Sequence, residues 1–141
     1  MLVHAHSGLR WLVLGLLIYA IYNALASKTS YEKRDKMINL FAMISLHIQL
    51  VLGLILYYTS GNVSFDSGWM KNAVTRFYGL EHLSGMLLAL IVVTVGRKMA
   101  EQQEGPEQQN KKIFIMYTII LFLILASIPW LFRLSLNGSW L

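Results

Sequence analysis

Residues 37–58, MINLFAMISLHIQLVLGLILYY, form a long apolar run that contains no Asp, Glu, Lys or Arg. An α-helix needs about 20 consecutive apolar residues to cross the roughly 30 Å hydrocarbon core of a bilayer. The run meets that length, and His47 lies near its middle. We therefore expect a transmembrane helix with a histidine inside the membrane.

Three further runs have a similar length and character, at residues 8–26, 77–95 and 113–134. Together the four runs occupy most of the 141 residues and leave no room for a separate soluble domain. The sequence thus predicts an all-α protein, an integral membrane four-helix bundle formed by a single transmembrane domain over residues 1–141.

The composition supports a lipid environment and excludes several classes of protein. The chain is 56% hydrophobic and only 13% charged, whereas soluble domains average about 25% charged residues. The net charge of +5 does not indicate nucleic-acid binding, because the basic residues flank the apolar runs and form no continuous patch. The absence of cysteine excludes disulfides, thiolate metal sites, iron–sulfur clusters and covalently attached c-type haem.

Basic residues concentrate in the first and third connections between the runs. The first carries Lys28, Lys33, Arg34 and Lys36, and the third carries Arg97, Lys98, Lys111 and Lys112. The second connection has only Lys71 and Arg76. Because Lys and Arg are retained on the cytoplasmic side, we expect the first and third connections in the cytoplasm and both termini on the outer, periplasmic side.

Ionisable side chains inside membrane helices are costly and mark functional sites or buried pairs. The candidates are His6, Arg10, His47, Glu81 and His82. A rise of about 1.5 Å per residue puts His47 roughly 16 Å from Tyr58, near the midplane. The same rise puts His82 roughly 9 Å from Arg76, in the outer half. His6 and Arg10 lie one helical turn apart, on one face of the first helix.

Two membrane histidines on separate helices are typical of the axial ligands of a b-type haem. We therefore expect His47 and His82 to ligate a haem iron, with His6 as the alternative ligand. Gly79 and Gly85 flank His82 and would leave room beside it. A second interpretation is structural, since a membrane histidine can hydrogen-bond a neighbouring helix and small residues can serve helix packing.

The role of Arg10 has two interpretations as well. It could form a buried ion pair with Glu81, or it could bind either a quinone or the anionic propionate of a haem. The His-x-His start, His4 and His6, also allows a copper or zinc site at the outer face, with His82 as the third ligand. No arrangement typical of a hydrolase or nucleotide-binding enzyme occurs, and the sequence leaves open whether the protein is an enzyme.

Four segments resemble small bacterial four-helix membrane proteins described as cytochrome b-like. They are HAHSGLRWLVL at 4–14, LHIQLVLGLILYY at 46–58, MKNAVTRFYGLEHLSGMLLA at 70–89 and IPWLFR at 128–133. The resemblance implies a haem-binding bundle in the cytoplasmic membrane of a Gram-negative bacterium, with His6, Arg10, His47 and His82 at the matching positions. Leu83 stands where such proteins often have proline after the histidine.

The leading expectation is therefore a multi-pass membrane protein that binds haem b and passes single electrons between a quinol pool and a respiratory partner. The alternative is a small accessory subunit without a cofactor, which packs within a larger membrane complex. The short connections and the lack of a soluble domain favour this alternative.

Overall fold

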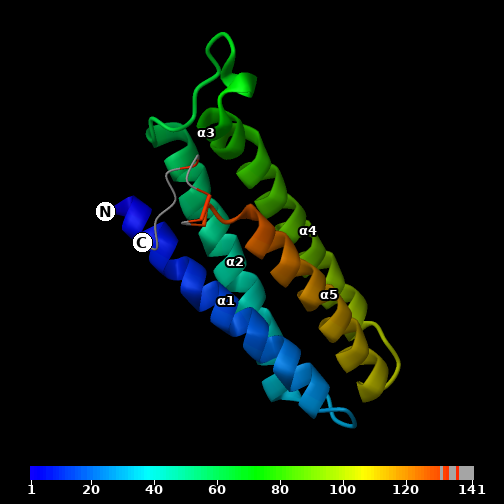
Figure 1. Cartoon of the computed structure of the whole chain (residues 1–141). Helices are drawn as coiled ribbons and strands as arrows, with labels where there is room; N and C mark the ends of the chain where they lie inside the picture. The colour runs from blue at the N-terminus through cyan, green and yellow to red at the C-terminus, as the bar shows by residue number, and fades with distance from the viewer. Residues whose placement is uncertain (131, 134–135, 137–141) are drawn as a thin grey trace.

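The computed structural model describes residues 1–130, 132–133 and 136, and the described residues contain helices but no strand. Three long helices are continuous: α1 (Leu2–Ala26), α2 (Lys33–Thr59) and α5 (Pro106–Ser127). The remaining long helix is built from three consecutive pieces (Figure 1). These pieces are α3 (Ala73–Arg76), a π-helical turn η2 (Phe77–Glu81) and α4 (His82–Glu101). A short 3₁₀ turn, η1 (Trp69–Lys71), precedes them.

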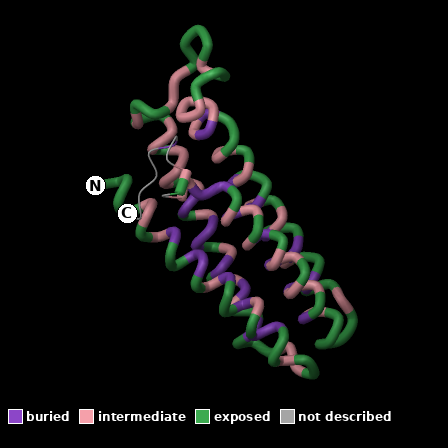
Figure 2. The backbone as a smooth tube through the Cα atoms, in the orientation of Figure 1, coloured by how far each residue is buried: buried purple, intermediate pink, exposed green. Residues whose placement is uncertain are grey.

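Each of the four helical rods is long and apolar enough to cross a membrane, which agrees with the four predicted spans. Their outward faces carry exposed large apolar side chains such as Ile18, Phe41, Ile91 and Phe122. Figure 2 shows the buried residues along the facing sides of the rods and the exposed residues on the outer sides. A water-soluble protein rarely exposes so much contiguous apolar surface, whereas lipid tails cover it without penalty.

The rods pack as a closed ring in which sequence neighbours lie side by side. Helix α1 packs against α2 and α5, and α4 packs against α5 and α2. Helices α1 and α4 therefore occupy diagonally opposite corners of the bundle. The centre is filled by fully buried side chains from every rod, among them Leu17, Ala42, Val93, Ile113, Tyr117 and Ile120.

We call the end of the bundle that carries residues 60–72 the upper end, and the end that carries residues 27–32 and 102–105 the lower end, as they stand in Figure 1. Side chains tie the lower end together. The amide of Asn23 donates to Asp35 Oδ1 at 2.7 Å, and Asn110 donates to the carbonyls of Ser27 and Ser30. These bonds join the start of α5 to the α1–α2 connection.

The helices begin at sequence signals that the hydropathy pattern alone does not reveal. Glu32 and Asp35 form a reciprocal capping box at the start of α2, and Asn72 Oδ1 accepts from the backbone N–H of Val74 at the start of α3. Pro106 opens α5 after Gly105, whose positive φ of 92° suits glycine. Three rods consequently begin in the polar connections, before the starts predicted at residues 37, 77 and 113, and α1 begins at Leu2, before the start predicted at residue 8.

The predicted end of the fourth helix at residue 134 is wrong. Helix α5 ends at Ser127, and Ile128 has the extended ψ of 134°. The cause is Pro129, whose ring disfavours helical geometry at the preceding residue. The apolar run continues past the proline, and its residue 134 lies outside the described part of the chain. Figure 1 shows that α5 stops below the tops of α2 and of the α3–α4 rod.

Candidate functional site

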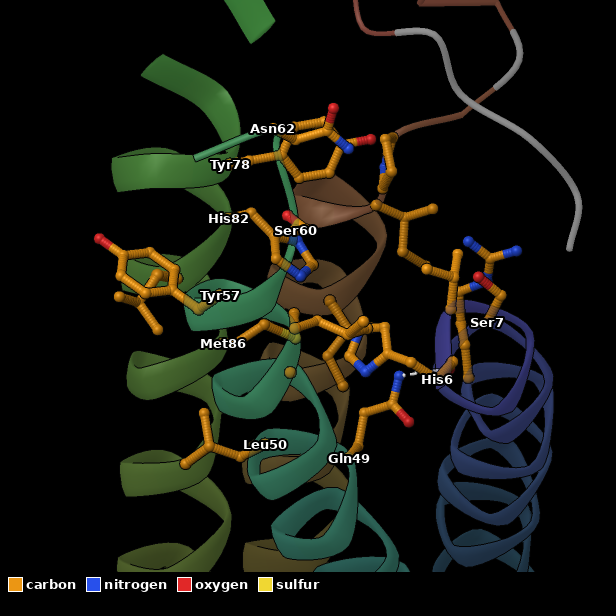
Figure 3. Close-up of a pocket in the computed structure, with 18 of the residues that line it drawn as sticks. His6, Ser7, Gln49, Leu50, Tyr57, Ser60, Asn62, Tyr78, His82 and Met86 are labelled. Atoms are coloured by element: carbon orange, nitrogen blue, oxygen red, sulfur yellow. Dashed lines mark hydrogen bonds between the residues drawn. The ribbon is translucent and has the colours of Figure 1, made fainter. Parts of the chain in front are cut away.

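A pocket of about 230 Å³ lies at the upper end of the bundle, above the end of α5 and between all four rods. Its floor is apolar and includes Val13, Leu46, Met86 and Ile124. Polar side chains line its middle and its mouth (Figure 3): His6, Ser7, Arg10, Gln49, Ser60, Asn62, Tyr78 and His82. The short α5 leaves the space in which these groups meet.

His6 reaches the pocket from α1. The backbone carbonyl of His6 accepts a hydrogen bond of 2.8 Å from the side-chain amide of Gln49 on α2. A Cβ atom added at Gly53 would lie 3.1 Å from His6 Cε1, so glycine at position 53 leaves room for the ring. His6 Nδ1 is buried and has no hydrogen-bond partner among the described residues. The ring is thus held by packing against α2, and its Nδ1 atom is not committed to a hydrogen bond with the described residues.

His82 enters the same pocket from the first turn of α4. Its Nδ1 atom lies 2.6 Å from the backbone carbonyl oxygen of Ser127, at the end of α5. A carbonyl can only accept, so Nδ1 carries the hydrogen and donates it. In the neutral imidazole this leaves the lone pair on Nε2. Metal-binding histidines are commonly held in this way.

The π-helical turn η2 ends directly before His82. Such turns are rare and frequently occur at functional sites. The turn places two aromatic rings against His82: the ring centre of Phe77 lies 5.8 Å from that of His82, and the ring centre of Tyr78 lies 6.4 Å away. These contacts enclose one side of the imidazole with apolar and aromatic surface.

His6 and His82 meet across the bundle. Their ring centres lie 6.2 Å apart and their planes form an angle of 75°. Figure 3 shows the two rings entering the pocket from opposite sides, since their helices stand at diagonal corners. The structure therefore brings together the histidine predicted as a principal ligand, His82, and the one predicted as the alternative, His6.

Arg10 lines the same pocket and is only 9% exposed. Its guanidinium also lies over the ring of Trp11, 5.2 Å from the ring centre. The ion pair between Arg10 and Glu81, one of the two interpretations of Arg10, is not formed. Glu81 is exposed and instead accepts a 2.8 Å hydrogen bond from the Nε atom of Arg76. Arg10 is thus a buried cation that faces the pocket.

His47 does not line the pocket. It is half-buried in α2, and its Nδ1 atom lies 2.8 Å from the carbonyl oxygen of Met43 one turn earlier. The α2 residues that face the pocket nearby are Leu46 and Gln49. The predicted pairing of His47 with His82 at one site is therefore not the arrangement in the structure.

His4 is exposed and does not line the pocket. Within residues 1–130, 132–133 and 136, no three histidine or carboxylate side chains gather into a group that could hold a metal ion. The cluster of His4, His6 and His82 considered for copper or zinc is not formed.

Four residues that complete the surroundings of the two imidazoles were not predicted from the sequence: Gln49, Gly53, Tyr78 and Ser127. Gln49 offered a signal, because an amide inside a membrane span needs a partner in the bundle. Ser127 acts through its backbone carbonyl, and a pattern of side chains in the sequence does not predict the role of a backbone group.

Comparisons with known proteins add no family assignment. No protein-family model matches the chain, and neither the curated proteins nor the solved structures gave a significant match.

Proposed function

We propose that the protein is a membrane-bound haem b protein whose iron is held by His6 and His82. The observation that carries the proposal is the 6.2 Å separation of the two ring centres. Two imidazoles at this separation would have room to hold one metal ion between them, because an imidazole nitrogen binds a transition metal at about 2 Å. This pair replaces His47 and His82, because His47 lies away from the pocket.

The groups around the two imidazoles fit the same ligand. His82 donates through Nδ1 and keeps the Nε2 lone pair for a metal. Arg10 supplies a buried positive charge beside the pocket, suited to an anionic propionate. The cavity of about 230 Å³ is smaller than the roughly 300–1,000 Å³ of typical ligand pockets. A group as large as haem would therefore also need the mouth of the pocket, where Ser60 and Asn62 lie.

A bound haem b supplies a one-electron couple whose potential depends on the axial ligands and their hydrogen bonds. The chain's own residues bind the group, fix one imidazole and exclude water from the floor of the pocket. We propose single-electron transfer between a quinol pool and a partner in the bacterial cytoplasmic membrane. From the positive-inside rule we expect the pocket in the periplasmic half of the bilayer, because the basic connections lie at the lower end.

The test is an optical spectrum of the protein purified from haem-replete cells, recorded in the oxidised and the dithionite-reduced forms. We expect a Soret band, reduced α and β bands, and a pyridine haemochrome signal of about one haem per chain, because one pair of ligands is present. A colourless protein, purified folded from haem-replete cells, would overturn the proposal. The His6→Ala/His82→Ala double variant is the matched control for haem bound non-specifically to detergent.

A cofactor-free accessory subunit is the second candidate. A wide groove between α1 and α2 faces outward and is lined almost entirely by apolar side chains, including Leu12, Leu16, Phe41 and Ile44. Such a groove can receive a helix of a neighbouring subunit. Co-purification from native membranes tests this candidate, and a protein that migrates alone and carries haem would exclude it.

A further inference from the structure

The carbonyl that accepts from His82 is available because α5 ends there. The last four carbonyls of a helix have no intrahelical donor. The chain leaves the helix at Ile128, and no backbone N–H of the described residues bonds to the carbonyl of Ser127. The hydroxyl of Ser127 bonds back to the carbonyl of Leu123 at 2.7 Å, so it does not compete for Ser127's own carbonyl. Ser127 thus presents an acceptor to the neighbouring helix.

Gly85 lets that acceptor come close enough. It lies one turn after His82 and on the same face of α4, which packs against α5. A Cβ atom added at Gly85 would overlap the hydroxyl oxygen of Ser127 and would lie 3.1 Å from its Cβ. A side chain at position 85 must therefore displace the Ser127 hydroxyl and move the end of α5 from α4 by a few tenths of an ångström.

We infer that Gly85 is a positioning residue for His82. By admitting Ser127 against α4, glycine at position 85 keeps the 2.6 Å hydrogen bond from His82 Nδ1–H to the Ser127 carbonyl and so directs the Nε2 lone pair into the pocket. The hydrogen bond fixes both the tautomer and the ring orientation. The contribution of this hydrogen bond to haem binding rests on the proposed function, whereas its effect on the His82 tautomer does not.

The two imidazoles are consequently unequal. His82 has a fixed donor–acceptor direction, while His6 Nδ1 has no partner among the described residues. A hydrogen bond from Nδ1–H to a carbonyl raises the basicity of the opposite nitrogen. We therefore expect His82 to be the stronger ligand of the pair, with Gly85 maintaining that difference.

Gly96 provides a matched control on the same helix. It lies three turns further along α4, also against α5, where an added Cβ would lie 2.8 Å from the Cβ of Met116. Gly85→Ala and Gly96→Ala thus both wedge the same helix pair apart, the first against Ser127 and the second against Met116. Only the first wedge is at the His82 bond. The double variant Gly85→Ala/Ser127→Gly removes both clashing atoms of Ser127 and keeps its carbonyl.

The primary readout is ¹⁵N NMR of histidine-labelled protein in nanodiscs, prepared without haem. We expect His82 to show a protonated Nδ1 and an unprotonated Nε2 in the parent protein. Gly85→Ala should lose this signature, Gly85→Ala/Ser127→Gly should restore it, and Gly96→Ala should keep it. An Nε2–H tautomer in the parent overturns the inference, as does an unchanged signature in folded Gly85→Ala. If Gly85→Ala does not fold, the parent tautomer and its return in the double variant decide the question.

Haem titration separates this inference from the proposed function. Losing a hydrogen bond to a ligating histidine typically lowers metal affinity about 10- to 100-fold. We expect that loss in Gly85→Ala, recovery in Gly85→Ala/Ser127→Gly and no loss in Gly96→Ala. A parent protein that shows the expected tautomer but binds no haem contradicts the proposed function alone. Haem binding with equal affinity in Gly85→Ala and the parent contradicts the inference alone.

Discussion

The hydroxyl of Tyr57 on α2 donates a 3.0 Å hydrogen bond to the carbonyl of Gly79, in the middle of the π-helical turn. The bond ties the turn before His82 to the opposite wall of the pocket, which Tyr57 itself lines. Gly79 also packs beneath Phe65 and Trp69, since a Cβ atom there would lie 3.6–3.7 Å from their rings. The irregular turn is thus held from α2 and from the upper connection at once.

Replacing Tyr57 with Phe should destabilise the fold by about 0.5–1.5 kcal/mol, the usual net value of a single hydrogen bond. Tyr58→Phe is the matched control, because its side chain is 84% exposed. The measurement is denaturant unfolding in mixed micelles. Equal stability of the two variants would show that the Tyr57 bond does not hold the turn.

Haem retention should depend on the two pocket histidines and not on the other two. We expect His6→Ala and His82→Ala each to lose most of the haem, because each removes a ligand from the pair 6.2 Å apart. His4→Ala and His47→Ala should retain it, since neither side chain lines the pocket. Pyridine haemochrome content per protein measures this. Loss in His47→Ala with retention in His6→Ala would reverse the assignment.

Arg10→Leu removes a cation that is 9% exposed and lines the pocket. A nearby positive charge stabilises the reduced haem, so its removal should lower the midpoint potential by roughly 60 mV, a tenfold change for one electron. The exposed Lys71 provides the charge-matched control, and Lys71→Leu should leave the potential within a few millivolts of the parent. Redox titration of the purified variants tests this. Equal potentials for Arg10→Leu and the parent would exclude an electrostatic role.

The lower end should be sensitive to Asp35. This carboxylate is 3% exposed and accepts from the side chain of Asn23 and from the backbone N–H of Glu32. Asp35→Ala leaves both donors without their acceptor, which should cost about 1–3 kcal/mol of unfolding free energy. The exposed Glu104 serves as the control, and Glu104→Ala should change stability by less than about 0.5 kcal/mol. A neutral Asp35→Ala variant would show that water replaces the carboxylate.

The predicted orientation can be tested by cysteine labelling, because the chain has no cysteine of its own. Single cysteines at Ser30 and Gln103 should resist an impermeant thiol reagent in intact cells, and a cysteine at Asn62 should react. The reason is the retention of the Lys- and Arg-rich connections in the cytoplasm. The reverse labelling pattern would invert the topology and move the pocket to the cytoplasmic half.

The sequence predicts the four rods well, because apolar runs of membrane length leave few alternatives to helices. The predicted end of α5 is wrong because the prediction rests on hydropathy averaged over many residues. The run around Ser127 and Pro129 stays apolar, while the helix ends through the local backbone restriction that proline imposes. Hydropathy averaged over a membrane span does not register a single residue.

The candidate site shows a different limit. Depth along the helix put His47 at the midplane, but each residue turns the helix by about 100°, and the pocket receives Leu46 and Gln49 instead. The pairing of Glu81 failed for a similar reason. The π-helical turn changes which neighbours meet, and Arg76 reaches Glu81 within the same rod. The direction in which a side chain points depends on how the rods pack against one another. The hydropathy of a single sequence does not encode that packing.

The π-helical turn also sets the direction, around the axis of the rod, in which the residues before the turn point. One residue beyond the α-helical repeat rotates the upstream chain by about 100° around the rod while lengthening it by only about 1.5 Å. Residues 60–72, with Phe65 and Trp69 in edge contact at 5.0 Å, therefore stand over the pocket wall formed by Tyr57. Deleting one residue from Phe77–Glu81 would leave His82 and α4 in register with α5 and swing this aromatic pair to another side. Inserting or deleting one residue in this turn thus changes the direction of the upper connection without altering the membrane-spanning length of the helix.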